Sequence, residues 1–270
     1  MIRIFMPFTL TGVTVLFGFV VDKYDIATMN ELGTRSSQQD SIGYAISEKY
    51  GVCYAVLADG MGGLRHGKEV SSLLVQSSMN RFHMCERNEY DFSPIPTGII
   101  SDLNNEVLRM LEGLEGSGGS TYIGVYIDNR EMFFASVGDS KLYLIGGEGS
   151  YRRLNIDHNF GRDLDELVKE GKISQEEAQN NGQRNALTSY MGAEDIRLVH
   201  YNDRAIELDK GDIVILMSDG VTGTLSMDEV AACFKGKSIE AGMEELRNSV
   251  IARQKKNQDN FSAIAIRIRK

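Results

Sequence analysis

An apolar run from Val52 to Ala58 is followed at once by Asp59 and then by three glycines within four residues. Such a run predicts a strand, and the glycines predict a turn in which the backbone must approach another group closely. The strand therefore delivers one carboxylate to a turn, where phosphates and hard cations are the usual partners. Asp-Gly is also among the commonest turn dipeptides, so this motif alone is more often a simple chain reversal.

Three further aspartates stand at or beside the ends of apolar, strand-like runs. They are Asp139 after Phe133–Val137, Asp219 after Ile213–Met217, and Asp259 before Phe261–Ile266. Because hard divalent cations prefer oxygen ligands, four carboxylates presented in this way could converge on one metal site.

Composition limits the classes of partner and the number of domains. The 270 residues can bury a substantial core, and no repeat or Pro/Gly/Ser-rich linker divides them, so one catalytic domain is the simplest division. The net charge of −9 argues against nucleic acid as the main partner. Cys53, Cys85 and Cys233 show neither a disulfide framework nor zinc spacing, and this usage suits a reducing cytoplasm.

The first segment, Met1 to Val21, is apolar apart from Arg3 and a few threonines and glycines. A cation followed by an apolar stretch resembles a signal or anchor segment, and the length approaches that of a membrane span. Pro7 and two glycines interrupt the stretch, and its β-branched residues suit a strand at least as well. We expect residues 1–22 to form an apolar extension, as an extra strand or loosely ordered chain, with a membrane anchor over residues 1–21 as the alternative.

Apolar runs and periodicities predict groups of strands separated by helices. The expected strands cover residues 24–35, 42–46, 52–58, 120–128, 132–137, 141–145, 204–208, 212–217 and 263–268. Helices are expected after the Gly-rich turn, from about Val70 to Phe82, and over 99–114, 226–234 and 239–254, where apolar residues recur at helical spacing. This order is not a strict strand-helix alternation, so an α+β layered sandwich is favoured.

Residues 157–192 are mostly polar and differ in character from the rest of the chain. Two short helices are expected at 163–170 and 174–180, and Ser174 with Glu177 gives the second one a capping-box pattern. We expect this block to be an insertion or flap outside the core.

Taken in chain order, the polar motifs resemble those of a known family. They are Arg35-x-x-Gln38-Gln39-Asp40, Asp59-Gly60-Met61-Gly62-Gly63, Gly119-Ser120-Thr121, Val137-Gly138-Asp139-Ser140-Lys141, Ser218-Asp219-Gly220 and Asp259-Asn260. From about Tyr24 to Lys270 the chain resembles a metal-dependent serine/threonine protein phosphatase of type 2C in its compact bacterial form. The catalytic domain would cover residues 23–270, with the flap at about 157–192.

The resemblance implies a four-layer αββα sandwich, in which two antiparallel sheets are flanked by helices and the metal site lies in a cleft at one end. Asp59 would bridge two Mn²⁺ or Mg²⁺ ions, and the carbonyl of Gly60 would bind one of them. Asp219 and Asp259 would complete the shell of the other ion. Asp139 would contribute to a third, weak site.

The resemblance also implies roles for the residues around the ions. Asp40 would act largely through metal-bound water, and Arg35 would hold the phosphate oxygens through its planar fork. A hydroxide that bridges the two ions would attack phosphorus.

Two departures from the family pattern affect these expectations. Met61 stands where eukaryotic members often carry a histidine proposed as general acid, so a side chain at this position cannot protonate the leaving group. Gly223 replaces an aspartate usually found four residues after Asp219, so the third site should be weak or absent.

The sequence thus predicts hydrolysis of phosphoserine and phosphothreonine in proteins, among them a cognate protein kinase, by a cytoplasmic monomer. The alternative from another class is a pseudophosphatase, which would use the same fold as a phosphoprotein-binding regulatory module. Loss of a metal-binding aspartate would be the sign of that alternative, and Asp59, Asp219 and Asp259 are all present.

Overall fold

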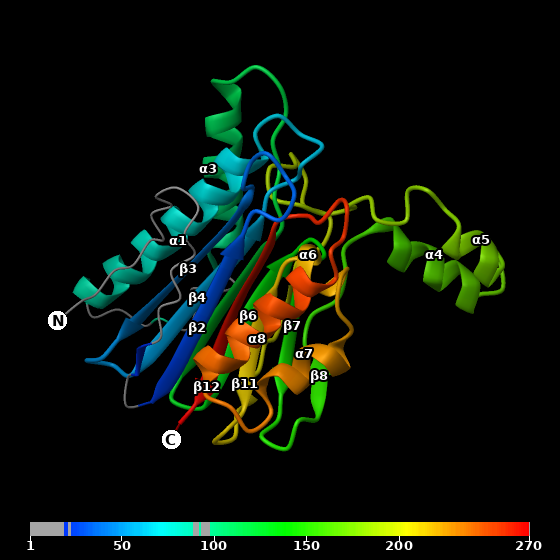
Figure 1. Cartoon of the computed structure of the whole chain (residues 1–270). Helices are drawn as coiled ribbons and strands as arrows, with labels where there is room; N and C mark the ends of the chain where they lie inside the picture. The colour runs from blue at the N-terminus through cyan, green and yellow to red at the C-terminus, as the bar shows by residue number, and fades with distance from the viewer. Residues whose placement is uncertain (1–18, 21–22, 89–91, 93–97, 270) are drawn as a thin grey trace.

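The structure is a computed structural model, and it describes residues 19–20, 23–88, 92 and 98–269. Two β-sheets with exclusively antiparallel pairings form its centre (Figure 1). The first sheet has the order β1 (Phe19–Val20), β2 (Tyr24–Glu31), β12 (Phe261–Ile268), β11 (Ile213–Met217), β7 (Lys141–Ile145) and β8 (Tyr151–Arg153). The second has the order β10 (Ile206–Glu207), β6 (Glu131–Val137), β5 (Tyr122–Asp128), β4 (Val52–Asp59) and β3 (Asp40–Ser47), and β9 (His200–Tyr201) also pairs with β6.

Helices cover the outer face of each sheet. α1 (Gly67–Asn88) and α3 (Ile100–Glu112) pack on the sheet that contains β4, through a cluster that includes Leu74, Phe82 and Leu103. α7 (Met227–Phe234) and α8 (Ile239–Ala252) pack on the sheet that contains β12, through another cluster. The predicted α+β sandwich of two antiparallel sheets with flanking helices is thereby confirmed.

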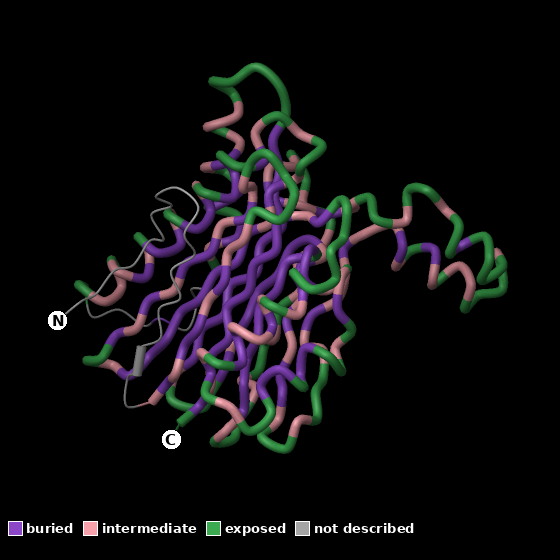
Figure 2. Tube along the Cα trace, viewed as in Figure 1, coloured by how far each residue is buried: buried purple, intermediate pink, exposed green. Residues whose placement is uncertain are grey.

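Between the two sheets lies a third cluster of buried side chains, to which the inner faces of both sheets contribute, for example Leu57 and Val125 from one and Leu216 and Ile264 from the other. Figure 2 shows this burial as continuous along the central strands. The strand predicted from the apolar run, β4, is buried along its whole length up to Ala58. Asp59 is its first residue that is not buried, so the strand carries a carboxylate out of the core.

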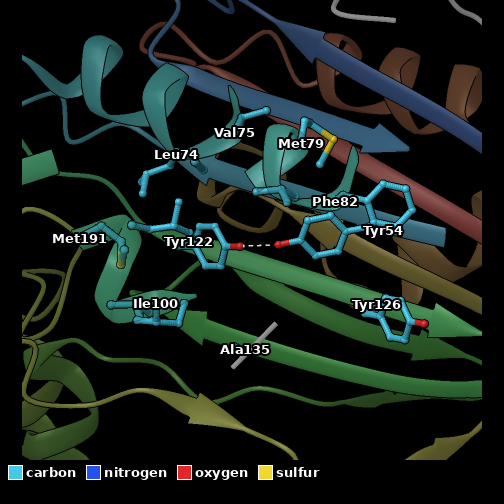
Figure 3. Close-up of a cluster of buried hydrophobic side chains, with 14 of the residues drawn as sticks. Tyr54, Leu74, Val75, Met79, Phe82, Ile100, Tyr122, Tyr126, Ala135 and Met191 are labelled. Atoms are coloured by element: carbon cyan, nitrogen blue, oxygen red, sulfur yellow. Dashed lines mark hydrogen bonds between the residues drawn. The ribbon is translucent and has the colours of Figure 1, made fainter. Parts of the chain in front are cut away.

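The cluster beneath α1 contains the hydrogen-bonded hydroxyls of Tyr54 and Tyr122 (Figure 3), and Ser78 of α1 adds a third buried hydroxyl. The hydroxyls of Tyr54 and Tyr122 lie 2.8 Å apart, and the Tyr122 hydroxyl lies 3.2 Å from Ser78 Oγ. All three side chains are completely buried. Because a buried hydroxyl without a partner is costly, these contacts tie β4, β5 and α1 together in one arrangement.

The polar block after residue 157 leaves the sandwich and carries α4 (Phe160–Lys169) and α5 (Gln175–Gln179), which project to one side in Figure 1. The capping box of Ser174 and Glu177 is confirmed. Arg184 joins the two helices, because it donates two hydrogen bonds of 2.9 Å to Asp165 and one of 3.2 Å to the carbonyl of Ala178. The two short helices expected in this block are present. The block does not lie outside the core along its whole length, because Met191 is buried in the cluster that packs beneath α1.

Several predicted boundaries were wrong. The strand expected over 24–35 ends at Glu31, because Gly33 adopts a φ of +62° and turns the chain. The strand expected over 204–208 is reduced to β10, because the Asn202 side chain accepts from the Phe134 amide and donates to the Arg204 carbonyl, which holds a turn there. β8, β9 and the four-residue helix α6 (Asp219–Thr222) were not predicted.

Only Phe19 and Val20 of the apolar extension are among the described residues, and they pair with β2 as the short strand β1. Residues 1–18, on which the expected extra strand or membrane anchor depends, lie outside the described residues. No helix in the described part of the chain is both long and apolar enough to cross a membrane.

Candidate active site

Asp40 and Asp59 lie opposite each other at the ends of β3 and β4. The main chain of Asp59 is held by the neighbouring Gly119-Ser120-Thr121 segment. Its amide donates to Thr121 Oγ1 at 3.0 Å, and its carbonyl accepts from the Thr121 amide and from Ser120 Oγ, each at 2.9 Å. This segment, one of the motifs noted in the sequence, therefore fixes the direction in which Asp59 leaves the strand.

Asp40 joins the two sheets at this end of the sandwich. Its Oδ2 accepts hydrogen bonds from Ser218 Oγ at 2.8 Å and from Ser262 Oγ at 2.7 Å, and both serines belong to the opposite sheet or its immediate extension. Burial raises the pKa of Asp40 to about 6, although the two serine hydroxyls act in the opposite direction. Neither serine was expected to contribute to the site.

Asp219, Asp259 and Asp139 reach the same end from the other sheet. Asp219 begins α6 two residues after β11, Asp259 precedes β12 by two residues, and Asp139 lies in the turn between β6 and β7. Because β11 pairs with both β12 and β7, with Met217 opposite Ala263 and Lys141, these three turns are neighbours.

The carboxylates of this cluster lie close to one another, and the positive charge near them is too small to balance theirs. Asp59 is only partly exposed, and the protein atoms around its carboxylate, together with the charges of Asp40, Asp219 and Asp139, raise its pKa well above the ordinary value. Asp219 is exposed as a residue. Desolvation of its carboxylate by the surrounding protein, together with the charges of Asp139, Asp259 and Asp40, raises its pKa to about 6. A cation placed among these groups would offset both the repulsion and the burial.

In the glycine turn after β4, Gly60 is required for steric reasons, and Gly62 is close to neighbouring side chains. A Cβ atom at Gly60 would lie 2.5 Å from the carbonyl oxygen of Gly67 and 2.6 Å from that of Gln39. A Cβ atom at Gly62 would lie 3.0 Å from Gln39 Oε1 and 3.8 Å from Arg35 Nη1. The turn therefore runs close to the loop that precedes β3, and the predicted close approach of the backbone is present.

Arg35 comes from that loop and lies beside the carboxylates. Its Nη2 donates to Asp259 Oδ2 at 2.7 Å, and its side chain is 52% exposed. The structure thus brings the sequence-predicted guanidinium, the glycine turn and one of the predicted metal-binding carboxylates together. A half-exposed Arg can still turn its remaining donors towards an anion.

No group of three or more His, Cys, Asp or Glu side chains, among the described residues, already forms a compact metal cage. Mg²⁺ and Mn²⁺ keep several waters and are commonly bound through one or two carboxylates each, so such a cage is not required for them. The donor set at this end, which consists of carboxylates and main-chain carbonyls, is the set that these ions prefer.

Residues around Asp139 form a part of the site that sequence reasoning missed. Asn159 Nδ2 donates to Asp139 Oδ2 at 3.2 Å, and the main chain of Gly138 exchanges two hydrogen bonds with His158, at 3.0 and 3.1 Å. Burial lowers the pKa of His158 to about 4, so this imidazole is a neutral structural acceptor. The adjacent Asp157-His158-Asn159 at the start of the polar block was the available signal.

Gly223, the departure noted in the sequence, lies at the C-terminal end of α6 and is exposed. Lys255 Nζ donates to its carbonyl at 2.5 Å. Gly223 has no side-chain oxygen, and its main-chain carbonyl already has a cationic partner.

Comparisons with known proteins identify the family and the fold. The family model described as protein phosphatase 2C matches residues 31–256. A protein phosphatase 2C-type protein of Streptococcus pyogenes serotype M6 is 31% identical over 218 residues, which are 78% of this chain and 85% of that protein. The solved serine/threonine phosphatase of S. agalactiae is 27% identical, with a TM-score of 0.74 over 91% of this chain and 99% of that chain.

A further solved structure shares the fold at lower identity. The catalytic domain of the serine/threonine protein phosphatase PstP, determined in complex with two manganese ions, is 20% identical, with a TM-score of 0.70 over 92% of this chain and 99% of that chain.

Proposed function

Since this chain belongs to the protein phosphatase 2C family and is therefore a metal-dependent serine/threonine protein phosphatase, we propose that Asp59, Asp219 and Asp259 hold its cations. The observation that carries this assignment is the convergence of the carboxylates at one end of the sandwich, where desolvation first and mutual repulsion second raise the pKa of both Asp59 and Asp219. The Gly60 carbonyl, at the turn that excludes a side chain, is a further proposed ligand.

We propose two Mn²⁺ or Mg²⁺ ions per chain. The relative PstP, which was solved with two manganese ions, supports this number. A third ion would depend on Asp139, whose carboxylate is already engaged by Asn159, and on the corner at Gly223, which lacks a carboxylate. A third site is therefore proposed to be weak.

Bound divalent cations supply an activated water and neutralise charge on the phosphate during in-line displacement. Arg35 is proposed to bind the phosphate oxygens of the substrate through the donors that it does not share with Asp259. Asp40 is proposed to orient the water ligands of the cations, because Ser218 and Ser262 hold its carboxylate in place. Met61 offers no proton, so the leaving group must take its proton from solvent or a water in the site.

We propose that residues 23–270 form the catalytic domain, with the flap at about 157–192 and residues 1–22 as an apolar N-terminal extension. Phosphoserine and phosphothreonine proteins, among them a cognate protein kinase, are the proposed partners, and a cytoplasmic monomer is the proposed form. The free cysteines of the core support a reducing compartment. A membrane anchor formed by residues 1–21 is the alternative for location.

Hydrolysis of p-nitrophenyl phosphate tests the metal assignment. The purified chain would be assayed with Mn²⁺, with Mg²⁺ and with excess chelator, beside Asp219→Ala and the control Asp209→Ala, which removes an exposed carboxylate paired with Arg130. We expect metal-dependent turnover in the native protein and in the control, and its loss in Asp219→Ala. Native turnover in folded Asp219→Ala would refute the assignment, and inactivity with every metal would favour the phosphoprotein-binding module.

A further inference from the structure

One buried side chain beside the carboxylates has no role in the proposed chemistry. Gln258, which directly precedes Asp259, is only 7% exposed. Its Nε2 donates to the carbonyl of Gly220 at 2.9 Å and to that of Asp259 at 3.3 Å. Its Oε1 accepts from Thr224 Oγ1 at 2.9 Å. Both ends of this amide are therefore satisfied, and both contact the segment that begins with Asp219.

The main chain of Gln258 contacts a second segment of the site. Its carbonyl accepts from the amide of Thr34 at 2.9 Å and from Thr34 Oγ1 at 3.0 Å. Thr34 directly precedes Arg35. A Cβ atom at Gly33 would lie 2.7 Å from the same carbonyl oxygen, so the two loops are in close contact here.

α6 depends on such external contacts. It has only four residues, and a helix of this length cannot hold its own direction in water. Asp219 is its first residue, so the orientation of that carboxylate depends on what fixes Gly220 and Thr224. Gln258 provides hydrogen bonds to both.

We infer that Gln258 is a positioning residue that holds Asp219 in register with Asp259 and with the loop of Arg35. The inference rests on the proposed function, because it assigns a supporting residue to the carboxylates proposed as metal ligands. The side chain of Gln258 fixes α6, whereas its main-chain carbonyl fixes Thr34. Replacing the side chain should therefore weaken cation binding more than phosphate binding.

Gln258→Met separates the contact of the side chain with α6 from the contact of the main chain with Thr34. Methionine has a similar length to glutamine but lacks its amide donor and acceptor. The Mn²⁺ affinity of the substrate-free protein would be measured from the signal of free Mn²⁺ in electron paramagnetic resonance. We expect Mn²⁺ to bind about tenfold more weakly to Gln258→Met, the lower end of the range for residues that support metal ligands. At saturating Mn²⁺, the KM for p-nitrophenyl phosphate should stay within about twofold of native, since the contacts of Thr34 remain.

Thr224→Val removes the hydroxyl that contacts Gln258 Oε1 at 2.9 Å, and with it the contact of that hydroxyl with the Gly220 carbonyl at 2.8 Å. It should weaken Mn²⁺ binding in the same direction, and the double variant should show less than the sum of the two effects, as contacting residues do. Tyr122→Phe is the matched control, because it also removes a buried hydrogen bond but lies in the cluster beneath α1. It should lower the Tm and leave Mn²⁺ binding unchanged.

Native Mn²⁺ affinity in Gln258→Met would overturn the inference. So would a loss of affinity in Tyr122→Phe equal to that in Gln258→Met, since the effect would then be one of general stability. Asp219→Ala separates this failure from that of the proposed function. If Asp219→Ala binds Mn²⁺ as the native protein does, the metal assignment fails, and the role of Gln258 fails with it.

Discussion

Gly220→Ala should damage both the stability and the site of this phosphatase, although alanine is normally the better residue in a helix. A Cβ atom at this position would lie 1.9 Å from the carbonyl oxygen of Asn260, whereas ordinary contact begins at 3.4 Å. The α6 turn and the loop before β12 must therefore separate by about 1.5 Å, or the backbone must deform, to admit one methyl group.

The two opposing effects of this substitution differ in size. Helix propensity alone predicts that alanine stabilises the folded state by about 0.5–1 kcal/mol over glycine. Overpacking of a well-packed site typically costs about 1–3 kcal/mol, and here the clash is with main-chain atoms that cannot rotate away. We expect a net decrease of about 1–2 kcal/mol in the free energy of unfolding, which for a chain of this size lowers the Tm by roughly 2–8 °C.

The expected effect on catalysis is larger than that on stability. Asp219 directly precedes Gly220, and Asp259 directly precedes Asn260, so the separation acts between two proposed metal ligands. A displacement of about 1 Å in a catalytic arrangement can lower the rate about 100-fold. Thermal unfolding by circular dichroism and kcat/KM for p-nitrophenyl phosphate, measured well below the Tm, would give the two quantities separately.

Gly182→Ala in the flap is the matched control, because nothing lies within 4 Å of the added Cβ atom. It should change the Tm and kcat/KM little. If Gly220→Ala is as stable and as active as the control, the close approach of α6 to Asn260 is not a constraint, and the steric reasoning is refuted.

Three further predictions concern separate parts of the molecule. Tyr122→Phe leaves the buried hydroxyl of Tyr54 without its partner and should cost about 1–3 kcal/mol in the free energy of unfolding, measured by urea denaturation; an unchanged midpoint would contradict this. Arg35→Ala should raise the KM for p-nitrophenyl phosphate about tenfold or more, because a charge-assisted hydrogen bond to an anion is lost. Arg65→Ala, in the neighbouring loop, should leave this KM unchanged. Equal KM values in the two variants would argue against contact between Arg35 and the phosphate. In metal-free protein at pH 8, Asp59→Asn should raise the Tm by about 2–4 °C for each kcal/mol of relieved repulsion, measured by calorimetry. The same substitution should abolish the stabilisation of the protein by Mn²⁺. A lower Tm would show that the repulsion is not the dominant effect.

The parts of the site that the sequence could predict lie next to strong local patterns. Asp59 ends the apolar run of β4 and Asp219 comes two residues after that of β11, so a strand followed closely by a carboxylate was visible at each position. The fold class followed from the order of strands and helices. These patterns are local, and they depend on burial and periodicity within about ten residues.

The parts of the site that the sequence did not predict depend on contacts between segments that are distant along the chain. The partners of Asp40, Ser218 and Ser262, are 178 and 222 residues away along the chain, and no periodicity indicates which strands become neighbours. α6 is too short for a helical period, and the contacts of Gln258 follow from its position between two loops that the fold brings together. Strands of two or three residues, such as β9, carry too few residues for an alternation to be recognised.

The central position of β12 has a consequence for synthesis. This strand pairs with β2 and β11 at once, and every other described strand precedes it in the chain. Until it leaves the ribosome, the sheet remains divided, Asp40 lacks Ser262, and Asp259 cannot face Asp219. A nascent chain that has not yet released β12 from the ribosome therefore lacks both contacts, and the proposed metal site is assembled only when this sheet closes.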